Sequence, residues 1–527
     1  MRPRPASVDD ADDPTGGVAV GSQPEASGPL GRLDVVAAVA LVVAALSLRW
    51  TFPSDGWFFD DAWQALAARA PLRMLPTVGQ TQPGYTAMLM AWSRVTGGSI
   101  GGLIVPAMVA GALGPPLLYL WLRRLRFDHG TSAVLAAALV IAPIHIRFSG
   151  RVKVYAVELV VVILIAAVLP RLAARRWGVR TALAWVVLAI ALTAFSSFTL
   201  LAAAAAGLIL VLHPRGDLRH RVVALGVQGL VVLGTIRRTQ ATYDASGVAE
   251  QWRSNGAMLT GPVRGLPTRL VERLHDVVAA YVDGPRWLTV AVLALAVAGL
   301  AVTAVRGPNP VSARFLVLGP VLAAAGSTLG RIPFGPPDGD LRRVSLWLFP
   351  AVAFGVASSV SALWSRLPSL RARQAWDVAL VALAVAVVVG LGHREPYWDT
   401  GAKRASEQVA SQLRDHEVVV VTRLSAYSFS LHSGLPVHLR AAPSRLVGFV
   451  PVIEDPRVVL PDAGAAAGDL TRVLADADLV TVVNAPVGRD NRDVMFDLAV
   501  TLTVGGFQPG ESRTVGQTTV ATWHRVP

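Results

Sequence analysis

The stretch WFFDDAWQAL, residues 57–66, follows the first long apolar run of the chain, residues 35–48. That run is close to the length that an α-helix needs to cross a bilayer. Asp60 and Asp61 are therefore expected a few residues above the membrane plane, between aromatic rings that suit the interface. We interpret the stretch as the active-site loop of a membrane enzyme. The alternative is a hydrated turn in which Asp61 caps a helix that begins near Ala62.

Composition decides the class of protein. Hydrophobic residues make up 53% of the 527 residues and charged residues only 16%. A soluble chain could not bury so much apolar surface, so the sequence indicates a polytopic α-helical membrane protein. The chain has no cysteine, which excludes disulfides and thiolate sites. Arginines in short cytoplasmic loops explain the net charge of +13, so no nucleic-acid partner is expected.

The chain divides into three parts. Residues 1–32 are rich in Pro, Gly, Ser and Asp and predict a disordered cytoplasmic tail without a cleavable signal peptide. Residues 33–392 carry the apolar segments. Residues 393–527 alternate short apolar runs with amphipathic stretches, which predicts a small α/β domain outside the membrane. Its expected strands are 418–421, 479–483 and 518–523, and its expected helices are 402–414 and 470–477.

About eleven transmembrane helices are predicted, because eleven apolar segments alternate with short charged loops. The segments are 33–50, 101–122, 131–146, 155–170, 181–195, 197–212, 222–236, 287–305, 315–329, 344–364 and 375–392. A cytoplasmic N-terminus puts the arginine-rich loops on the inner side of the plasma membrane at every second connection. The C-terminal domain is then extracytoplasmic. The break near residues 195–198 is the one boundary that no charge marks.

Cations remain in two of the outer loops under this topology. They are Arg147, Arg151 and Lys153 in the second loop and Arg331, Arg342 and Arg343 in the fourth. Cations on the outer side oppose the orientation rule, so an anionic ligand at the outer membrane surface is the simplest explanation. Lipid headgroups, or arginines that extend toward the interface, are the alternative.

The second outer loop leads into a helix with a charged face. Arg151, Tyr155 and Glu158 have the spacing of four and three residues that places side chains on one face of a helix. Glu158 lies about one turn inside the apolar span, where a carboxylate costs about 2.5–3.5 kcal/mol unless it is paired or faces water. Pairing with Arg151 or Lys153 is expected to offset that cost. A purely structural ion pair is the alternative.

The fourth outer loop, residues 330–350, combines prolines and glycines with two arginines before a helix. This composition predicts a rigid, irregular lid or turn. Arg342 and Arg343 stand at the mouth of the following helix. A guanidinium donates two parallel hydrogen bonds to phosphate, so this position suits a phosphate ligand.

Together these motifs resemble the GT-C glycosyltransferases. The carboxylate pair follows the first helix, Lys153, Tyr155 and Glu158 form a Lys-x-Tyr-x-x-acid pattern, and a Pro-Phe loop leads to Arg343, seven residues before Pro350. Within that superfamily the motifs are most similar to bacterial relatives of the protein O-mannosyltransferases and to the aminoarabinose transferase of lipid A. The resemblance covers the membrane region.

The chain departs from the common pattern of that superfamily at two positions. Asp60 and Asp61 replace an Asp-Glu pair, and Arg151 stands where many relatives carry an acid. Residues 82–92 resemble the juxtamembrane helix that such enzymes place over the site. The pattern itself predicts an interfacial amphipathic helix.

The resemblance implies an inverting transferase that uses a polyprenyl-phosphate sugar as donor and works on the outer face. The acceptor would be a hydroxyl of a glycan, a lipid or a protein. A hydroxyl acceptor needs a general base, for which Asp60 is the first candidate and Asp61 the second. The leaving phosphate needs stabilisation of its charge, which the cations would supply. No cofactor is indicated by the sequence, and a divalent metal remains an open alternative. The donor-phosphate residues are Lys153, Arg343, Arg151, Arg342 and Tyr155, and the supporting residues are Glu158, Arg147 and Arg331.

Two other classes of function compete with this one. A transporter of lipid-linked sugars should show internal repeats and helices broken near mid-membrane, whereas the charges here concentrate at one face. A membrane sensor or scaffold, with the outer domain as receptor, would not need Asp60. The outer domain itself has no glycine-rich phosphate loop, and its His432 and His438 are expected to be ordinary surface or core residues.

Overall fold

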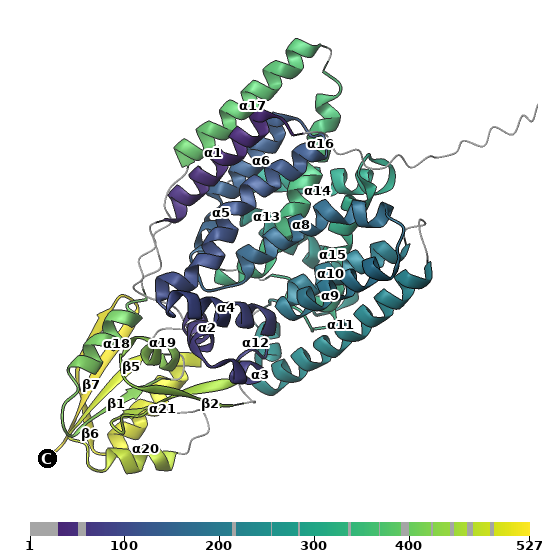
Figure 1. Cartoon of the computed structure of the whole chain (residues 1–527). Helices are drawn as coiled ribbons and strands as arrows, with labels where there is room; N and C mark the ends of the chain where they lie inside the picture. The colour runs from purple at the N-terminus through teal and green to yellow at the C-terminus, as the bar shows by residue number, and fades with distance from the viewer. Residues whose placement is uncertain are drawn as a thin grey trace, which may run out of the picture.

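The computed structural model divides into a helical part and a smaller strand-containing part at the C-terminal end (Figure 1). It describes residues 30–50, 59–212, 218–254, 256–282, 285–335, 339–367, 369–391, 400–422, 425–442, 447–460, 467–484 and 490–527. Most of the predicted N-terminal tail, and the start of the WFFDDAWQAL stretch at residues 57–58, lie outside the described residues.

The helical part is built from α-helices joined by short turns and 3-10 helices. They are α1 (Arg32–Arg49), α2 (Phe59–Arg69), η1 (Leu72–Met74), α3 (Leu75–Val78), α4 (Pro83–Thr96), α5 (Ile100–Arg124), α6 (His129–Ile141), α7 (Pro143–Ser149), α8 (Tyr155–Ala174), α9 (Val179–Phe195), α10 (Ser197–Leu212), α11 (Leu218–Ser246), α12 (Val248–Ser254), η2 (Val263–Gly265), α13 (Leu266–Ala279), α14 (Arg286–Arg306), α15 (Pro310–Thr328), η3 (Gly339–Leu348), α16 (Phe349–Trp364) and α17 (Leu370–Leu391). Every predicted span coincides with helix.

Seven helices in the described ranges are long and apolar enough to cross a membrane, or eight if the bent pair α6 and α7 forms one span. The expected number of about eleven is therefore not reached. Helices α9 and α10 have only 17 and 16 residues, fewer than the roughly 20 that a bilayer requires. Helix α1 has 18 residues but carries Arg32, Asp34 and Arg49.

Two of the charges of α1, on Asp34 and Arg49, are buried against neighbouring helices. Asp34 accepts hydrogen bonds from Arg123 at 2.9 Å and from Tyr119 at 3.1 Å. Arg49 is fully buried and donates to the Val140 carbonyl at 3.4 Å, beside the 58° bend between α6 and α7. The bend occurs at Pro143, which lacks an N–H group, so carbonyls near it need other donors. Arg49 supplies one.

The uncharged break between the fifth and sixth predicted spans is present. Helix α9 ends at Phe195 and α10 begins at Ser197. The Thr199 amide donates to the Ser196 hydroxyl oxygen at 3.1 Å, and the Ser196 amide donates to Thr199 Oγ1 at 3.0 Å. This reciprocal cap supplies hydrogen-bond acceptors for amide groups that a helix start leaves without partners. It therefore favours the start of a new helix at Ser197, although no charged residue marks the break.

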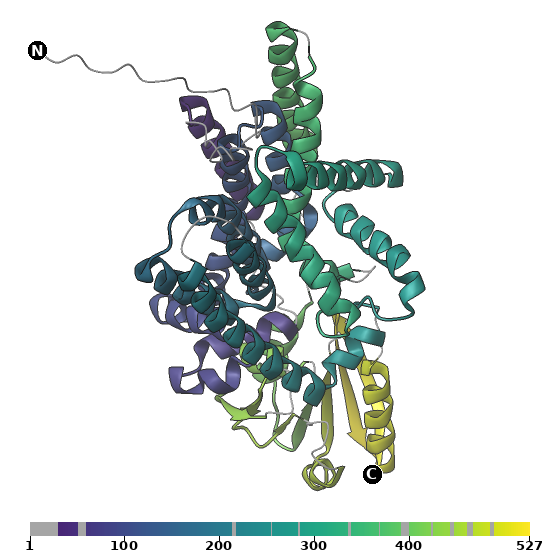
Figure 2. The ribbon, with the colours of Figure 1, turned by 90° about the vertical axis from the view of Figure 1, so that its right-hand side faces the viewer.

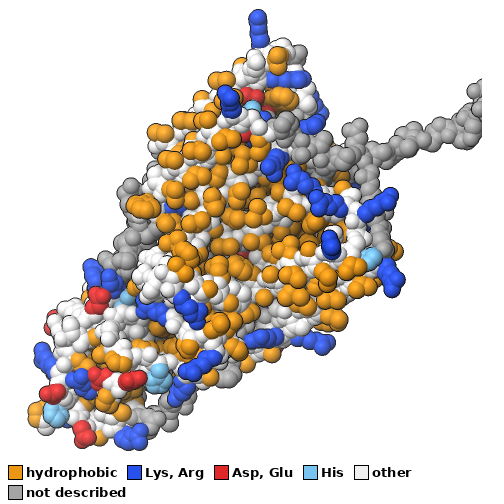
Figure 3. All heavy atoms as spheres, in the orientation of Figure 1, with side chains coloured by type: hydrophobic (Ala, Val, Ile, Leu, Met, Phe, Trp, Pro, Cys, Tyr) orange, Lys and Arg blue, Asp and Glu red, His pale blue; other side chains and the backbone are white. Residues whose placement is uncertain are grey.

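The helical part is held together by close helix packing and presents apolar side chains outward. Gly299 of α14 and Gly355 of α16 approach so closely that a Cβ at either would collide with a backbone oxygen of the other helix. Small residues permit such contacts between membrane helices. Figure 2 shows the helices gathered toward one end of the molecule and the strands at the other, and Figure 3 shows hydrophobic side chains over much of the visible face of the helical part.

The C-terminal part is an α/β domain, as the sequence predicted. A five-stranded sheet has the order β4-β1-β5-β7-β6, with β4, β1 and β5 parallel and with β7 and β6 antiparallel, and β2 pairs with β3 separately. The elements are α18 (Ala402–Ser411), β1 (Glu417–Val421), α19 (Ala426–His432), β2 (Val437–Ala441), β3 (Phe449–Ile453), β4 (Val458–Val459), α20 (Ala467–Leu474), β5 (Leu479–Asn484), α21 (Asp490–Val504), β6 (Phe507–Val515) and β7 (Thr518–Arg525).

The α/β domain docks on α2 and α3. Helix α19 packs on α2, and Tyr427 and Phe449 join the buried cluster that contains Trp63. The Tyr427 hydroxyl donates to the Phe449 carbonyl at 2.6 Å. Gly448, with φ of +77°, lies against the Thr77 carbonyl, where a Cβ would collide. The C-terminal domain therefore covers the helix that carries Asp60 and Asp61 (Figure 1).

Phe449→Ala tests this docking. The Phe449 ring is fully buried in the cluster, so its loss is expected to destabilise the protein by about 3–5 kcal/mol. Thermal unfolding of the purified protein in detergent measures the effect. The matched control is Phe496→Ala, at a ring that is 69% exposed, where a change within about 0.5 kcal/mol is expected. Equal effects of the two substitutions would contradict the docking.

Candidate functional site

Helix α2 places both acidic residues in its first turn. It begins at Phe59, so Asp60 and Asp61 lie inside the helix, and Asp61 is not a cap before Ala62. Negative charge is favourable at a helix N-terminus because the backbone amides and the helix dipole point toward it. The two environments differ, since Asp60 is half-buried and Asp61 is 1% exposed.

The turn at residues 150–154 brings two buried cations against α2. Arg151 Nε lies 3.7 Å from Asp61 Oδ2, and Lys153 Nζ lies 4.3 Å from the centre of the Trp63 ring. Both cations are 5% exposed. A buried charge is costly unless it is paired, so the Asp61–Arg151 contact and the cation–π contact hold the turn against α2. The two outer loops that the sequence singled out therefore meet.

Glu158 is placed differently from the expectation. The sequence suggested an ion pair between Glu158 and Arg151 or Lys153, but Arg151 pairs with Asp61, and Glu158 makes no ion pair within the described residues. Glu158 is 1% exposed on α8, close enough to Ser196 to hydrogen-bond with it. Its Oε2 atom has no hydrogen-bond partner among the described residues. The reason is geometric, because Arg151 reaches Asp61 and Lys153 lies over Trp63, both on α2.

Tyr85 of α4 links the two acidic groups. Its side chain is fully buried and packs edge-on against Phe195, with ring centres 5.6 Å apart. Burial, and then the negative charges of Asp61 and Glu158, hold the pKa of the Tyr85 hydroxyl well above its ordinary value. Tyr85 is therefore a buried neutral hydroxyl that lies near enough to both acids to sense their charges. The predicted helix over the site is present as α4.

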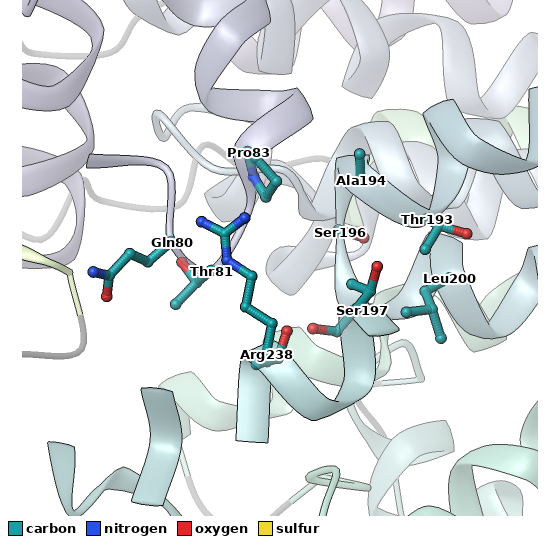
Figure 4. Close-up of a pocket in the computed structure, with 11 residues that line it drawn as sticks. Gln80, Thr81, Pro83, Thr193, Ala194, Ser196, Ser197, Leu200 and Arg238 are labelled. Carbon is teal, nitrogen blue, oxygen red and sulfur yellow. The ribbon is translucent and has the colours of Figure 1, made fainter. Parts of the chain in front are cut away.

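Two adjoining cavities share Ser197, Leu200 and Thr239, and Glu158 lines the second of them. The first, of about 190 Å³, lies between α4, the break before α10, and α11 (Figure 4). The second, of about 110 Å³, is lined by Glu158 and Tyr155 of α8 together with side chains from α11, α12 and the fourth outer loop.

The sequence did not single out the α11 and α12 residues that line these cavities. Helix α11 continues ten residues beyond the predicted span, to Ser246, and contributes Thr235, Thr239 and Tyr243. These hydroxyls recur every four residues, which places them on one helix face. That spacing is the signal that could have identified them. Trp252 of α12 lines the second cavity and contacts Tyr243, with ring centres 4.8 Å apart.

Residues of the predicted fourth loop, residues 330–350, line the second cavity. Arg331 is exposed, lines this cavity and lies 3.8 Å from Asp244. The predicted irregular lid contains the 3-10 helix η3, whose backbone carries Arg342 and Arg343, although both side chains lie outside the described residues. Val344, the next residue, lines the same cavity as Glu158.

Arg147 and the two histidines named from the sequence, His432 and His438, line neither cavity. Arg147 is half-buried in α7 and lines neither cavity. His432 is buried in α19, and His438 Nδ1 lies 3.8 Å from a carboxylate oxygen of Glu454. Within the described ranges, no three His, Asp or Glu side chains gather as a metal site would need.

Comparison with known proteins finds structural likeness only. No protein-family model and no curated protein sequence matches the chain. Two cryo-EM structures of a mutant arabinofuranosyltransferase AftD from Mycobacteria are similar to it. The class 2 structure has a TM-score of 0.43 and 17% identity, and the class 1 structure 0.38 and 14%, each over 95% of this chain. The chain spans 42% of the length of that protein.

The contact between Asp61 and Arg151 is tested by Arg151→Gln. Removing one member of a buried ion pair leaves a buried charge, so a loss of about 3–5 kcal/mol of stability is expected. The double variant with Asp61→Asn should lose less than the sum of the single variants, and thermal unfolding measures all three. The control is Arg253→Gln, whose exposed pair with Glu250 should contribute about 0–1 kcal/mol. A loss for Arg151→Gln no larger than for the control would refute the contact.

Proposed function

We propose that the chain is a GT-C-like inverting glycosyltransferase of the plasma membrane. It would transfer a sugar from a polyprenyl-phosphate donor to a hydroxyl of a glycan, lipid or protein on the outer face. The carrying observation is that the acidic first turn of α2 meets the buried cations Arg151 and Lys153 at one end of a helical part rich in membrane-length helices. A base and a phosphate-binding group are the two components that this reaction needs.

Asp60 is the proposed general base. Asp61 is 1% exposed and its carboxylate contacts Arg151, so it is less accessible to an acceptor hydroxyl. Asp60 is half-buried at the same helix end, so it can reach an acceptor hydroxyl without breaking the Asp61–Arg151 contact. We assign Asp61 the role of holding Arg151 in position.

Lys153, Arg343 and Arg151 are the proposed donor-phosphate ligands. Lys153 is buried, and a cation in a region of low dielectric stabilises developing negative charge more strongly than in water. Arg343 directly precedes Val344, which lines the cavity beside Glu158. The leaving group is a phosphate, so it departs as an anion and needs no proton.

The proposed reaction is a single displacement. The acceptor oxygen attacks the anomeric carbon and forms the new glycosidic bond, while the bond from that carbon to the phosphate oxygen breaks. The phosphate keeps the electron pair, and Asp60 takes the proton of the acceptor hydroxyl. Attack from the side opposite the phosphate inverts the configuration of the sugar. The arginine-rich loops favour an inner N-terminus, which would put this chemistry and the α/β domain on the outer face.

The proposed base is tested by Asp60→Asn. Loss of a general base is expected to lower sugar transfer by a factor of about a hundred or more. Transfer of radiolabelled sugar from a panel of polyprenyl-phosphate sugars into membranes measures it, with equal amounts of each protein. Glu272→Gln, at an exposed carboxylate of α13, is the matched control and should keep full activity. Donor binding without transfer by either wild type or variant would favour a transporter or sensor.

The proposed phosphate ligand is tested by Lys153→Gln. Loss of a group that stabilises the leaving phosphate is expected to lower kcat by about 10²–10³-fold. Lys153→Arg keeps the charge and should recover part of the loss. Lys403, the other lysine of the chain, lies in α18 of the C-terminal domain, so Lys403→Gln is the matched control. An undiminished kcat in Lys153→Gln would remove Lys153 from the proposed mechanism.

A further inference from the structure

The two adjoining cavities, which share Ser197, Leu200 and Thr239, are not lined by the proposed base or by the proposed phosphate ligands Lys153 and Arg343. We call them together the α10 chamber, because both include Ser197 at the start of α10. Together they reach the lower end of the roughly 300–1,000 Å³ typical of small-molecule sites. The chamber borders Glu158 and Tyr155, one helical turn beyond the cations of the 150–154 turn.

Six neutral hydroxyl groups belong to residues that line the first cavity, whose wall is otherwise largely apolar. They belong to Thr81, Thr193, Ser196, Ser197, Thr235 and Thr239. Figure 4 shows Arg238 between Thr81 and the Ser196–Ser197 break. A hydroxyl can donate one hydrogen bond and accept two, so this set of hydroxyls matches a ligand that carries several hydroxyls of its own.

The second cavity adds aromatic rings to hydrogen-bonding groups. Tyr243 and Trp252 meet edge to face, and Gln82, Gln240 and Glu158 line the same space. Tyr and Trp combine an apolar face with one polar atom. A sugar ring has an apolar C–H face and a rim of hydroxyls, so it matches this combination, whereas a lipid tail would leave the amides and the carboxylate without partners.

Two buried polar atoms of residues that line the chamber have no hydrogen-bond partner among the described residues. Thr193 is 3% exposed, and its Oγ1 has no hydrogen-bond partner among the described residues. Glu158 Oε2 also lacks a hydrogen-bond partner among the described residues. Thr193 lines the first cavity of the chamber and Glu158 the second. A buried polar group without a partner costs about 1–3 kcal/mol, more if it is charged. A ligand with hydroxyl groups would supply the missing hydrogen bonds.

We propose that the α10 chamber binds a neutral sugar ring. Glu158 and the Thr193 hydroxyl receive or donate hydrogen bonds to the sugar hydroxyls, and Trp252 covers its apolar face. The inference rests on the proposed glycosyltransfer for its role in the reaction, and it deepens that proposal by assigning the place of the carbohydrate. The sugar can come from the lipid-linked donor or from an acceptor glycan, and both present the same chemistry.

Binding of free methyl pentofuranosides and methyl hexopyranosides to the full-length protein in detergent tests the proposal directly. Isothermal titration calorimetry is the readout. At least one glycoside should bind, and Thr193→Val, which removes one hydroxyl at constant shape, should weaken it about fivefold. Glu158→Gln, which replaces one carboxyl oxygen by an amide group of the same shape, should also weaken it, by about fivefold or more.

Thr131→Val is the matched control. Thr131 is also 3% exposed and its Oγ1 also lacks a partner among the described residues, but it lies in α6 and lines neither cavity. The Thr131→Val substitution should leave the affinity for the glycoside unchanged. Thr193→Val removes a hydroxyl that makes no hydrogen bond in the described structure, so it should not unfold the protein. Trp252→Leu is the second variant, and should also weaken binding.

Several results would overturn the inference. These are no binding of any glycoside, equal effects of Thr193→Val and Thr131→Val, or tight binding of inorganic phosphate that displaces the glycoside and depends on Arg238. The last result would make the chamber an anion site. If transfer is active, Thr193→Val should raise the KM of one substrate, and whether that is the lipid-linked donor or the acceptor identifies the source of the sugar.

The binding test is separable from the test of the proposed function. Glycoside binding that survives in Asp60→Asn, with no transfer by the wild type from any donor, would support the chamber and reject the enzyme. Transfer that is normal in Thr193→Val, Glu158→Gln and Trp252→Leu would support the enzyme and reject the chamber.

Discussion

The contact between the 150–154 turn and α2 is the constraint on which the candidate site depends. Asp61 and Arg151 are both nearly inaccessible to solvent and lie 3.7 Å apart, while Lys153 lies over Trp63 of the same helix. Neither charge could remain buried alone without a penalty of several kcal/mol. The 150–154 turn and α2 therefore hold each other in place. This contact also fixes the position of Asp60, which directly precedes Asp61 in α2.

Packing extends that constraint in two directions. On one side the C-terminal domain covers α2, where Tyr427 and Phe449 enter the cluster around Trp63. On the other side Tyr85 of α4 lies against Phe195, at the break that opens the α10 chamber. Because protein interiors are close-packed, a shift of α2 would require side chains in both the C-terminal domain and the chamber wall to move. The domain thus contacts the helix that carries Asp60 and Asp61.

The site was only partly predictable from the sequence. The acidic pair, Arg151 and Lys153 could be identified because charges beside apolar runs are conspicuous, and the structure brings them together. The partner of Arg151 could not be identified from the sequence. Spacing shows which residues share a helix face, but not the direction in which a turn points its side chains. Thr193, an ordinary residue in an apolar helix, becomes informative only when its hydroxyl is seen buried beside a cavity.

By itself, the sequence determined the membrane class, the position of the helices, and the strands of the C-terminal domain. These follow from hydrophobic length and periodicity, which are local properties of the chain. It overestimated the number of membrane-length helices, since α1, α9 and α10 proved too charged or too short. The pairing of Asp61 with Arg151, the docking of Phe449, and the hydroxyl-lined chamber were decided by tertiary structure alone. Each requires residues distant in the sequence to meet, and no local pattern records which surfaces will face one another.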